Sequence, residues 1–423
     1  MRQLRLLGLT SLSLLFCAWT PPRAEETRDL TWTFSGEARF RPEYRDNRDL
    51  TSAADDDLRQ GFMRLRLGIA ATMKDRYRVF AQVQDSRVAG EEISTASDQK
   101  NLDLHQGYVE FAPSPSTPLR FTLGRQEWFY GEHRLIGNFS WDNVGRSFDG
   151  VKARYARGKF FLDALLAQVS TTVSGGASTG SGLYGLYSQT APRPGAEYEA
   201  YWLLFDDHAS AAGELPGAFG TTAIHALGAR ARDRFGRFDF NAEAVWERGE
   251  WRGDDLAAHA FGAQGGVVFG TAAKTRLFAG YDFATGDRDP ADGRREEFFN
   301  FFPTNHPLYG YMDYEGWRNI ESPYAGVSLT RGRHFAQAKA HAFDLNEARG
   351  PWKDAAGIVM GFDPAGASGT SVGSEVDLTY RFTWTDKTLV EVGLSEFDPG
   401  RFARQTRGDD VSRWGYLMLT FAF

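Results

Sequence analysis

The sequence predicts an all-β protein, a single transmembrane antiparallel β-barrel of about 18 strands. Three observations lead to this prediction. Segments of about ten residues alternate between polar and apolar side chains, short and long connections follow one another, and 14 % of the residues are aromatic. In outer-membrane barrels, alternation turns one face of each strand to lipid and the other to the lumen, with short periplasmic turns and long external loops.

Length and composition exclude several other classes of protein. The 423 residues exceed what one soluble core normally holds, and no polar linker divides them. A barrel has no such limit, because each added strand widens its circumference. Helical membrane proteins are less polar than this chain, whose charged residues make up 24 % and whose mean hydropathy is −0.43. The formal charge of −7 argues against nucleic acid as a partner.

The first 24 residues are expected to be a signal peptide, and residues 25–423 the mature barrel. Arg2 and Arg5 precede an apolar run at 6–19, which is too short to cross a bilayer as a mature helix. The only cysteine, Cys17, lies in this run, and Phe16 before it is larger than the residue expected before a lipidated cysteine. The mature chain is therefore expected to hold no disulfide, thiolate metal site or cofactor.

The number of strands is predicted from two rules: side chains alternate between polar and apolar along each strand, and bacterial barrels have an even number of strands. Clear alternation covers 32–41, 63–69, 238–247 and 375–382. A first count gives 17 strands, and only 181–190 can supply the strand that an even number requires. The result is roughly 18 strands with both termini in the periplasm. The last strand ends on Phe423, which resembles the sorting signal of outer-membrane barrels.

The connections are expected to alternate in length along the whole chain. Short turns are expected at 74–76, 113–118, 156–158, 191–195, 233–237, 270–274, 331–333 and 385–387. Long external loops are expected near 45–60, 89–101, 128–146, 173–182, 207–219, 250–257, 286–318, 346–370 and 398–412.

Several motifs resemble one known family. GRQEWFYGEHRLIG at 124–137 leads into WDNVGRSFDGV at 141–151, and LDLHQGYVE at 102–110 stands just before them. FFPTNH at 301–306 and YGYMD at 309–313 lie in the longest loop. Together these segments resemble the alginate-export family of outer-membrane proteins. The resemblance implies an 18-stranded barrel whose lumen is rich in Arg and Lys and passes an anionic polysaccharide.

Cations on the polar faces of the strands are the candidates for lining such a path. A polyuronate needs cations spaced along the wall that release each unit, and the planar fork of arginine matches a carboxylate. The candidates are Arg39, Arg41, Arg64, Arg66, Arg78, Arg125, Lys152, Arg154, Arg230, Arg232, Arg276 and Arg381. The alternative is that they pair with carboxylates of neighbouring strands and only brace the wall.

The loop at 128–146 is the candidate for a constriction inside the barrel. Gly131, Gly137 and Gly145 allow it to bend. Its charged candidates are Glu127, Glu132, His133, Arg134, Asp142 and Arg146. The alternative is a structural loop fastened to the wall by its aromatic residues. The acidic run at 55–57 either binds calcium or is a solvated external loop.

The sequence favours a channel rather than an enzyme. It contains no Gly-x-Ser-x-Gly elbow, no phosphate-binding loop that opens a helix, and no paired-histidine zinc motif. We expect a protein of the bacterial outer membrane that exports an anionic polysaccharide or oligosaccharide or lets it diffuse. Membrane lipid and periplasmic export proteins are the expected partners. The alternatives are a general or small-molecule porin on the same scaffold and, more remotely, a barrel adhesin or enzyme.

Overall fold

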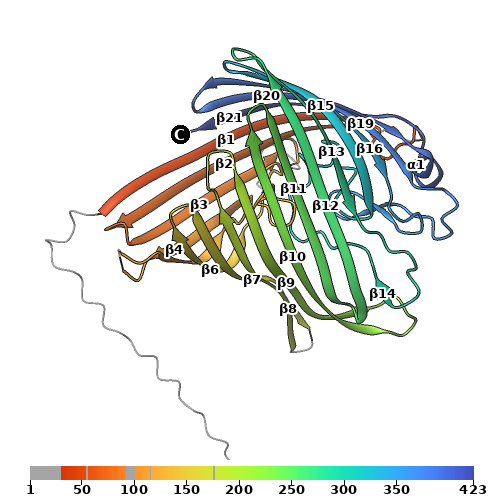
Figure 1. Cartoon of the computed structure of the whole chain (residues 1–423), viewed down its shortest axis with the longest axis horizontal. Coiled ribbons are helices and arrows are strands. Elements are labelled where there is room, and N and C mark those ends of the chain that lie inside the picture. Colours follow the sequence, from red (N-terminus) through yellow and green to blue (C-terminus); the bar gives the residue numbers. More distant parts are fainter. Residues whose placement is uncertain (1–29, 54–55, 92–100, 115, 175–176) are drawn as a thin grey trace, which may run out of the picture.

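A computed structural model describes residues 30–53, 56–91, 101–114, 116–174 and 177–423. The predicted signal peptide, with Cys17, lies outside the described residues, as does Asp55 of the acidic run. No helix in these ranges is long and apolar enough to cross a membrane. The described chain forms a closed barrel of 18 antiparallel strands, as predicted (Figure 1).

The barrel wall follows the order of the chain. Its strands are β1 (Leu30–Asp46), β2 (Leu58–Met73), β3 (Tyr77–Val88), β4 (Leu102–Phe111), β5 (Leu119–Gln126), β6 (Phe148–Arg157), β7 (Phe160–Ser174), β8 (Ala177–Thr190), β9 (Glu197–Ala212), β10 (Phe219–Phe235), β11 (Phe238–Trp251), β12 (Asp254–Phe269), β13 (Lys274–Ala284), β15 (Ile320–Arg331), β16 (His334–Asp344), β19 (Ser371–Thr385), β20 (Thr388–Pro399) and β21 (Ser412–Ala422). Each pairs with the next, and β21 pairs with β1 to close the ring (Figure 1).

Four short elements lie outside this ring of strands. They are β14 (Arg294–Arg295), β17 (Trp352–Lys353), β18 (Val359–Gly361) and α1 (Arg401–Thr406). All four belong to connections at the end of the barrel opposite Leu30 and Phe423, which is the external end in the predicted topology. At the other end, Phe423 exchanges backbone hydrogen bonds of 2.9 and 3.0 Å with Gly36, so the last residue takes part in closing the barrel.

The strand predicted from parity at 181–190 is present as the second half of β8. It pairs along its length with β7 and β9. Three predicted external loops are wrong, because 173–182, 207–219 and 250–257 are largely strand. The hairpin of β11 and β12, for example, turns at residues 252–253. At the start of β12 the inner face buries both the polar Asp254 and the apolar Leu256, so this part of the strand lacks the apolar-out, polar-in alternation that marks a membrane-spanning strand.

Strand β2 shows the expected two faces most clearly. Met63, Leu65 and Leu67 point outward and are about 40 % exposed, whereas Arg64 and Arg66 between them are buried inside the barrel. Trp246 and Leu378 are likewise exposed on β11 and β19. The apolar face of each strand therefore meets lipid and the polar face the lumen.

We expect Leu67→Arg to destabilise the barrel by about 2–4 kcal/mol, since it places a cation on the lipid face away from the interfaces. Unfolding by urea in lipid vesicles measures the loss. Leu102→Arg is the matched control, because Leu102 is an exposed residue at the external start of β4, where the same substitution costs about 0–1 kcal/mol. Equal losses in the two variants would contradict this placement in the membrane.

Candidate functional site

Two long connections fold into the barrel and pack against each other. We call residues 127–147, between β5 and β6, the constriction loop, and residues 285–319, between β13 and β15, the second inner loop. Their backbones pair: Gly137 N–H donates to Phe302 O at 2.8 Å, Phe302 N–H to Leu135 O at 2.8 Å, and Thr304 N–H to His133 O at 2.9 Å. The constriction loop is therefore held by backbone hydrogen bonds to a loop more than 150 residues away in the sequence.

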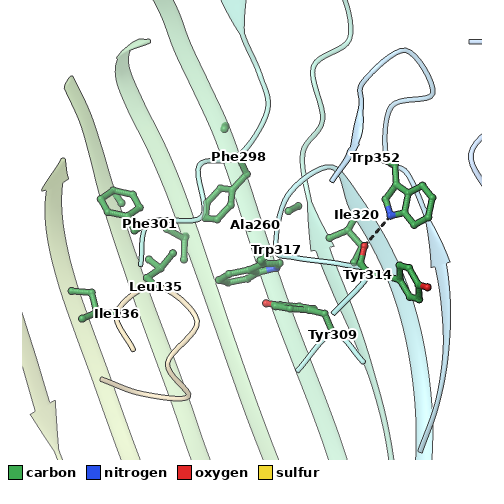
Figure 2. Packing of buried hydrophobic residues seen from close by; sticks show 14 of the residues in the cluster. Leu135, Ile136, Ala260, Phe298, Phe301, Tyr309, Tyr314, Trp317, Ile320 and Trp352 are labelled. Carbon is green, nitrogen blue, oxygen red and sulfur yellow. Dashed lines mark hydrogen bonds between the residues drawn. The ribbon is translucent and has the colours of Figure 1, made fainter. Parts of the chain in front are cut away.

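Apolar side chains from both loops fill the space between the strands. Figure 2 shows Leu135 and Ile136 of the constriction loop near Phe301, with Trp317 and Tyr309 lying farther across the barrel. These residues are almost completely buried. The lumen at this level is thus packed like a protein core rather than filled with water.

Arginines of β1 and β2 hold the constriction loop by its backbone carbonyls. Arg39 donates to Ser140 O at 2.8 Å and to Asp142 O at 2.9 Å, and Arg64 donates to the same two oxygens at 3.0 Å each. Arg41 donates to Trp141 O. These cations, predicted to line an open path, are buried and each donates to at least one loop carbonyl, while Arg41 and Arg64 also pair with Glu43 and Glu37.

A second cluster fixes the beginning of the constriction loop. Glu127 accepts hydrogen bonds from His105 at 2.7 Å, Arg66 at 3.2 Å and Asn138 at 3.0 Å. Burial raises the pKa of Glu127, but the hydrogen bonds and the charge of Arg66 outweigh it and hold the pKa below its ordinary value. Arg66 also donates to Val144 O at 3.1 Å, so one guanidinium joins both ends of the loop.

Carboxylates of β11, β13 and β19 also hold the two loops. Arg134 of the constriction loop lies 2.9 Å from Asp282 of β13 and 3.9 Å from Glu243 of β11, and it donates to the Tyr309 hydroxyl at 2.5 Å. Met312 N–H donates to Glu375 of β19 at 2.9 Å. The arginines of β1 and β2 therefore bind backbone carbonyls of the loops, whereas the carboxylates of β11, β13 and β19 bind Arg134 and a loop N–H group. Both sets of contacts help to fix the loops.

The remaining charged candidates of the constriction loop have separate roles. Arg146 donates to Gly137 O at 3.0 Å and to Pro303 O at 2.9 Å, so it joins the two loops. Asp142 turns its own loop by accepting from Val144 N–H at 2.8 Å. The His133 ring lies tilted against the Phe129 ring, with ring centroids 5.3 Å apart. Glu132 lies 4.0 Å from Arg134.

The other predicted lumen cations lie along the wall, most of them paired with carboxylates. Arg154 pairs with Asp163 at 2.6 Å, Arg230 with Glu199 at 3.0 Å, Arg276 with Asp239 at 2.5 Å, Arg381 with Glu391, and Arg232 with Glu197 at 3.8 Å. Arg78 lies over Phe80 and Tyr108, and Lys152 is half-buried. Cross-strand pairing, the alternative raised by the sequence, thus applies to many of these residues.

Arg125 is a correction to the prediction. It shares the outward face of β5 with the exposed Leu123 and pairs with Asp149 of β6 at 3.2 Å. It therefore does not face the lumen. The alternation of Leu119, Phe121 and Leu123 along the same strand already placed residue 125 outward.

A chamber of about 380 Å³ lies in the lumen between the loops and strands β1, β2 and β19–β21. It is lined by cations and aromatic rings, chiefly Arg39, Arg64, Arg381, Trp141, His306 and Tyr311. Trp141 stacks on His306 with ring centroids 4.0 Å apart, and His306 stacks on Tyr311 at 4.9 Å. Glu37 and Glu391 also line the chamber and pair with Arg64 and Arg381.

Trp141 separates this chamber from a second cavity on its external side. The second cavity, of about 210 Å³, is lined by Arg41, Arg45, Arg48 and Trp141. The guanidinium of Arg41 lies 4.0 Å from the centre of the Trp141 ring. The sequence did not single out Trp141 or His306 as functional, although both belong to the motifs that carry the resemblance. Among the described residues, no group of three or more His, Cys, Asp or Glu is placed to hold a metal ion.

Comparisons with known proteins agree on the kind of barrel. The model of a family described as alginate export matches residues 31–416. No curated protein matches the chain. The crystal structure of Pseudomonas aeruginosa OccK8 (OprE) is similar, with a TM-score of 0.60 and 10% sequence identity over 93% of this chain and 98% of that chain. Acinetobacter baumannii OccAB4 has a TM-score of 0.56 and 11% identity over 94% of this chain and 99% of that chain. Pseudomonas aeruginosa OpdK with vanillate has a TM-score of 0.58 and 9% identity over 92% of this chain and 98% of that chain.

Proposed function

The chain belongs to the alginate export family and forms a channel of the bacterial outer membrane, and from this premise we propose that it conducts an anionic, uronate-type saccharide. The family match supports a carbohydrate substrate, and the similar crystal structures are of outer-membrane channel folds. These comparisons point to transport rather than catalysis.

The observation that carries the proposal is the lining of the lumenal chamber. Arg39, Arg64 and Arg381 come from three strands and meet in one cavity with the Trp141 and Tyr311 rings. Arg39 and Arg64 contribute positive charge while they donate to the loop carbonyls, and the half-exposed Arg381 is the guanidinium that can bind the oxygens of a carboxylate. The flat aromatic rings offer apolar surface to a sugar ring. At about 380 Å³ the chamber lies at the lower end of the sizes typical of small-ligand sites.

The charge balance of the chamber suits passage rather than tight binding. Three arginines face two carboxylates, Glu37 and Glu391, so the wall keeps a small excess of positive charge. A carboxylate about 4 Å from one cation gains roughly 4 kcal/mol at an effective dielectric near 20, before desolvation. Conduction requires such moderate attraction, because each sugar unit must leave the site that it enters.

Arg381→Gln tests the chamber, because Arg381 is half-exposed and its side chain holds no loop carbonyl. We expect the variant to weaken the block of chloride current by oligouronate about tenfold, equivalent to about 1.4 kcal/mol. Single-channel recording in planar bilayers measures this block. Arg232→Gln is the control, since Arg232 is a lumenal cation outside the chamber with a side chain 54 % exposed. Equal effects of the two variants would show that only overall lumen charge matters.

A small-molecule porin is the second candidate function. The observation in its favour is the fold shared with OpdK, which was crystallised with vanillate, a small organic molecule. In that case small organic acids would block the current at least as well as oligouronate does. Arg381→Gln would then change both kinds of block by the same factor.

A further inference from the structure

A pocket of about 370 Å³ lies between the β11–β12 turn, the second inner loop and the connection after β16. We call it the external pocket, and its lining includes Trp251, Arg252, Arg295, Phe299, Arg318 and Lys353. It shares no lining residue with the lumenal chamber. Because the connections that form it join the ends of strands opposite Leu30 and Phe423, the pocket lies on the external side of the barrel.

The external pocket has an excess of positive charge. Glu297 pairs with both Arg295 and Lys353 and is the only carboxylate in the described lining. Arg252 is exposed, and its guanidinium lies 5.0 Å from the centre of the Trp251 ring. Of the four cations in the lining, Arg295 and Lys353 share Glu297, and Arg295 also pairs with Asp287 at 2.9 Å and Glu214 at 3.6 Å from outside the pocket, so Arg252 and Arg318 supply the excess.

Arg318 is the unusual member of this group. Across the described part of the chain, its guanidinium makes no hydrogen bond and no ion pair within 4.0 Å. Burial lowers its pKa even though several carboxylates lie in its surroundings. A Cβ on Gly357 would lie 2.3 Å from its Nη1 atom. Glycine at this position therefore leaves the room in which the guanidinium lies.

Four carboxylates lie in the surroundings of Arg318, and each has another partner or is buried: Glu297 pairs with Arg295 and Lys353. Glu247 accepts from Phe299 N–H at 2.8 Å, and Asp354 accepts from Ala356 N–H at 3.0 Å and Ile358 N–H at 2.9 Å. Glu315 is buried, and burial raises its pKa well above its ordinary value. Arg318 is half-buried, so its guanidinium faces the pocket with no protein partner within 4.0 Å among the described residues, and a bound anion would supply that partner.

We propose that the external pocket is a second binding site, in which Arg318 holds the carboxylate of a single uronic-acid unit while the sugar ring lies against Phe299 and Trp251. The choice of a uronic acid rests on the proposed function, whereas the need for an anion rests on Arg318 itself. Arg252 and Lys353 add positive charge at the edges of the pocket. A saccharide leaving or approaching the channel would meet this site on the external side.

The test measures the equilibrium binding of galacturonate to the full chain in detergent by titration calorimetry. We expect Arg318→Met to remove a site that the wild type shows, with at least a tenfold loss of affinity. Arg288→Met is the matched control and should keep that site, because Arg288 belongs to the same loop, has a side chain 74 % exposed and does not line the pocket. Unchanged binding by Arg318→Met, or equal losses in both variants, would overturn the proposal.

Thermal unfolding without ligand separates binding from a structural role. We expect Arg318→Met to unfold at the same temperature as the wild type or higher, because the lost cation had no partner, and to lose the stabilisation by galacturonate. A lower unfolding temperature without ligand would assign Arg318 to the structure instead. Inorganic phosphate that competes as strongly as galacturonate would overturn the assignment of a sugar ligand. The block of chloride current by oligouronate reports on the lumenal chamber, not on the external pocket. If oligouronate does not block the current but galacturonate still binds, only the proposed transport function is refuted.

Discussion

Replacing Arg134 by methionine should destabilise the barrel by about 3–5 kcal/mol, the usual cost of removing one partner of a buried ion pair. Arg134 is 4 % exposed and lies 2.9 Å from Asp282, which is itself fully buried. Its guanidinium also lies 5.0 Å from the centre of the Trp317 ring. Without it, two strand carboxylates face the packed loops with no cation between them. Urea unfolding in lipid vesicles measures the loss.

The double variant Arg134→Met with Asp282→Asn is the control for this interpretation. If the cost comes from the uncompensated carboxylate, neutralising Asp282 should restore a large part of the lost stability, because the two changes are coupled through one contact. If the cost came only from the lost packing of the arginine on Trp317 and Tyr309, the second change would restore nothing. Additive losses would therefore refute the electrostatic explanation.

Replacing Arg39 and Arg64 by alanine should release the constriction loop from the basic wall and raise single-channel conductance several-fold. The two side chains make four hydrogen bonds to Ser140 O and Asp142 O, and a hydrogen bond to a charged group contributes about 1.5–3 kcal/mol. Without them the carbonyls can be hydrated and the segment can leave the lumen. Recording in planar bilayers at 1 M salt, where lumen charge is screened, isolates the change in width.

Arg78→Ala is the control for this conductance change. Arg78 also faces the lumen from β3, but it lies over Phe80 and Tyr108 and makes no contact with the loop among the described contacts. Its removal should leave the conductance near that of the wild type. If the Arg39/Arg64 variant also conducts like the wild type, the remaining contacts, those of Arg41, Arg66 and the second inner loop, are enough to hold the constriction in place.

Local sequence patterns were enough to predict the barrel. Period two assigns each residue to lipid or lumen because successive side chains of a strand point to opposite faces, and the outward Leu65 and inward Arg66 follow it. Parity was enough to find the strand within β8 although its glycines weaken the alternation. The same pattern failed at 250–257, where Asp254 and Leu256 are both buried on the inner face, so polar and apolar residues no longer separate between the two faces.

The partners of the lumenal side chains could not be predicted in the same way. Arg64 was predicted to face the lumen, and it does, but its acceptors at Ser140 and Asp142 lie 76 and 78 residues away. Arg134 meets Tyr309 across 175 residues. Such contacts depend on the closure of the barrel and on how far each loop folds inward, and neither leaves a periodic mark in the sequence.

The sequence by itself therefore determined the number of strands, the two faces of the wall and the kind of membrane, because all three follow from local alternation. Only the tertiary structure decided which charges remain available. It assigned Arg39 and Arg64 to loop carbonyls and Arg134 to Asp282, and it left Arg318 without a close partner among the described residues. The reason is physical: a charge is satisfied by whichever group folding brings within a few ångströms of it, and most of these groups come from distant loops.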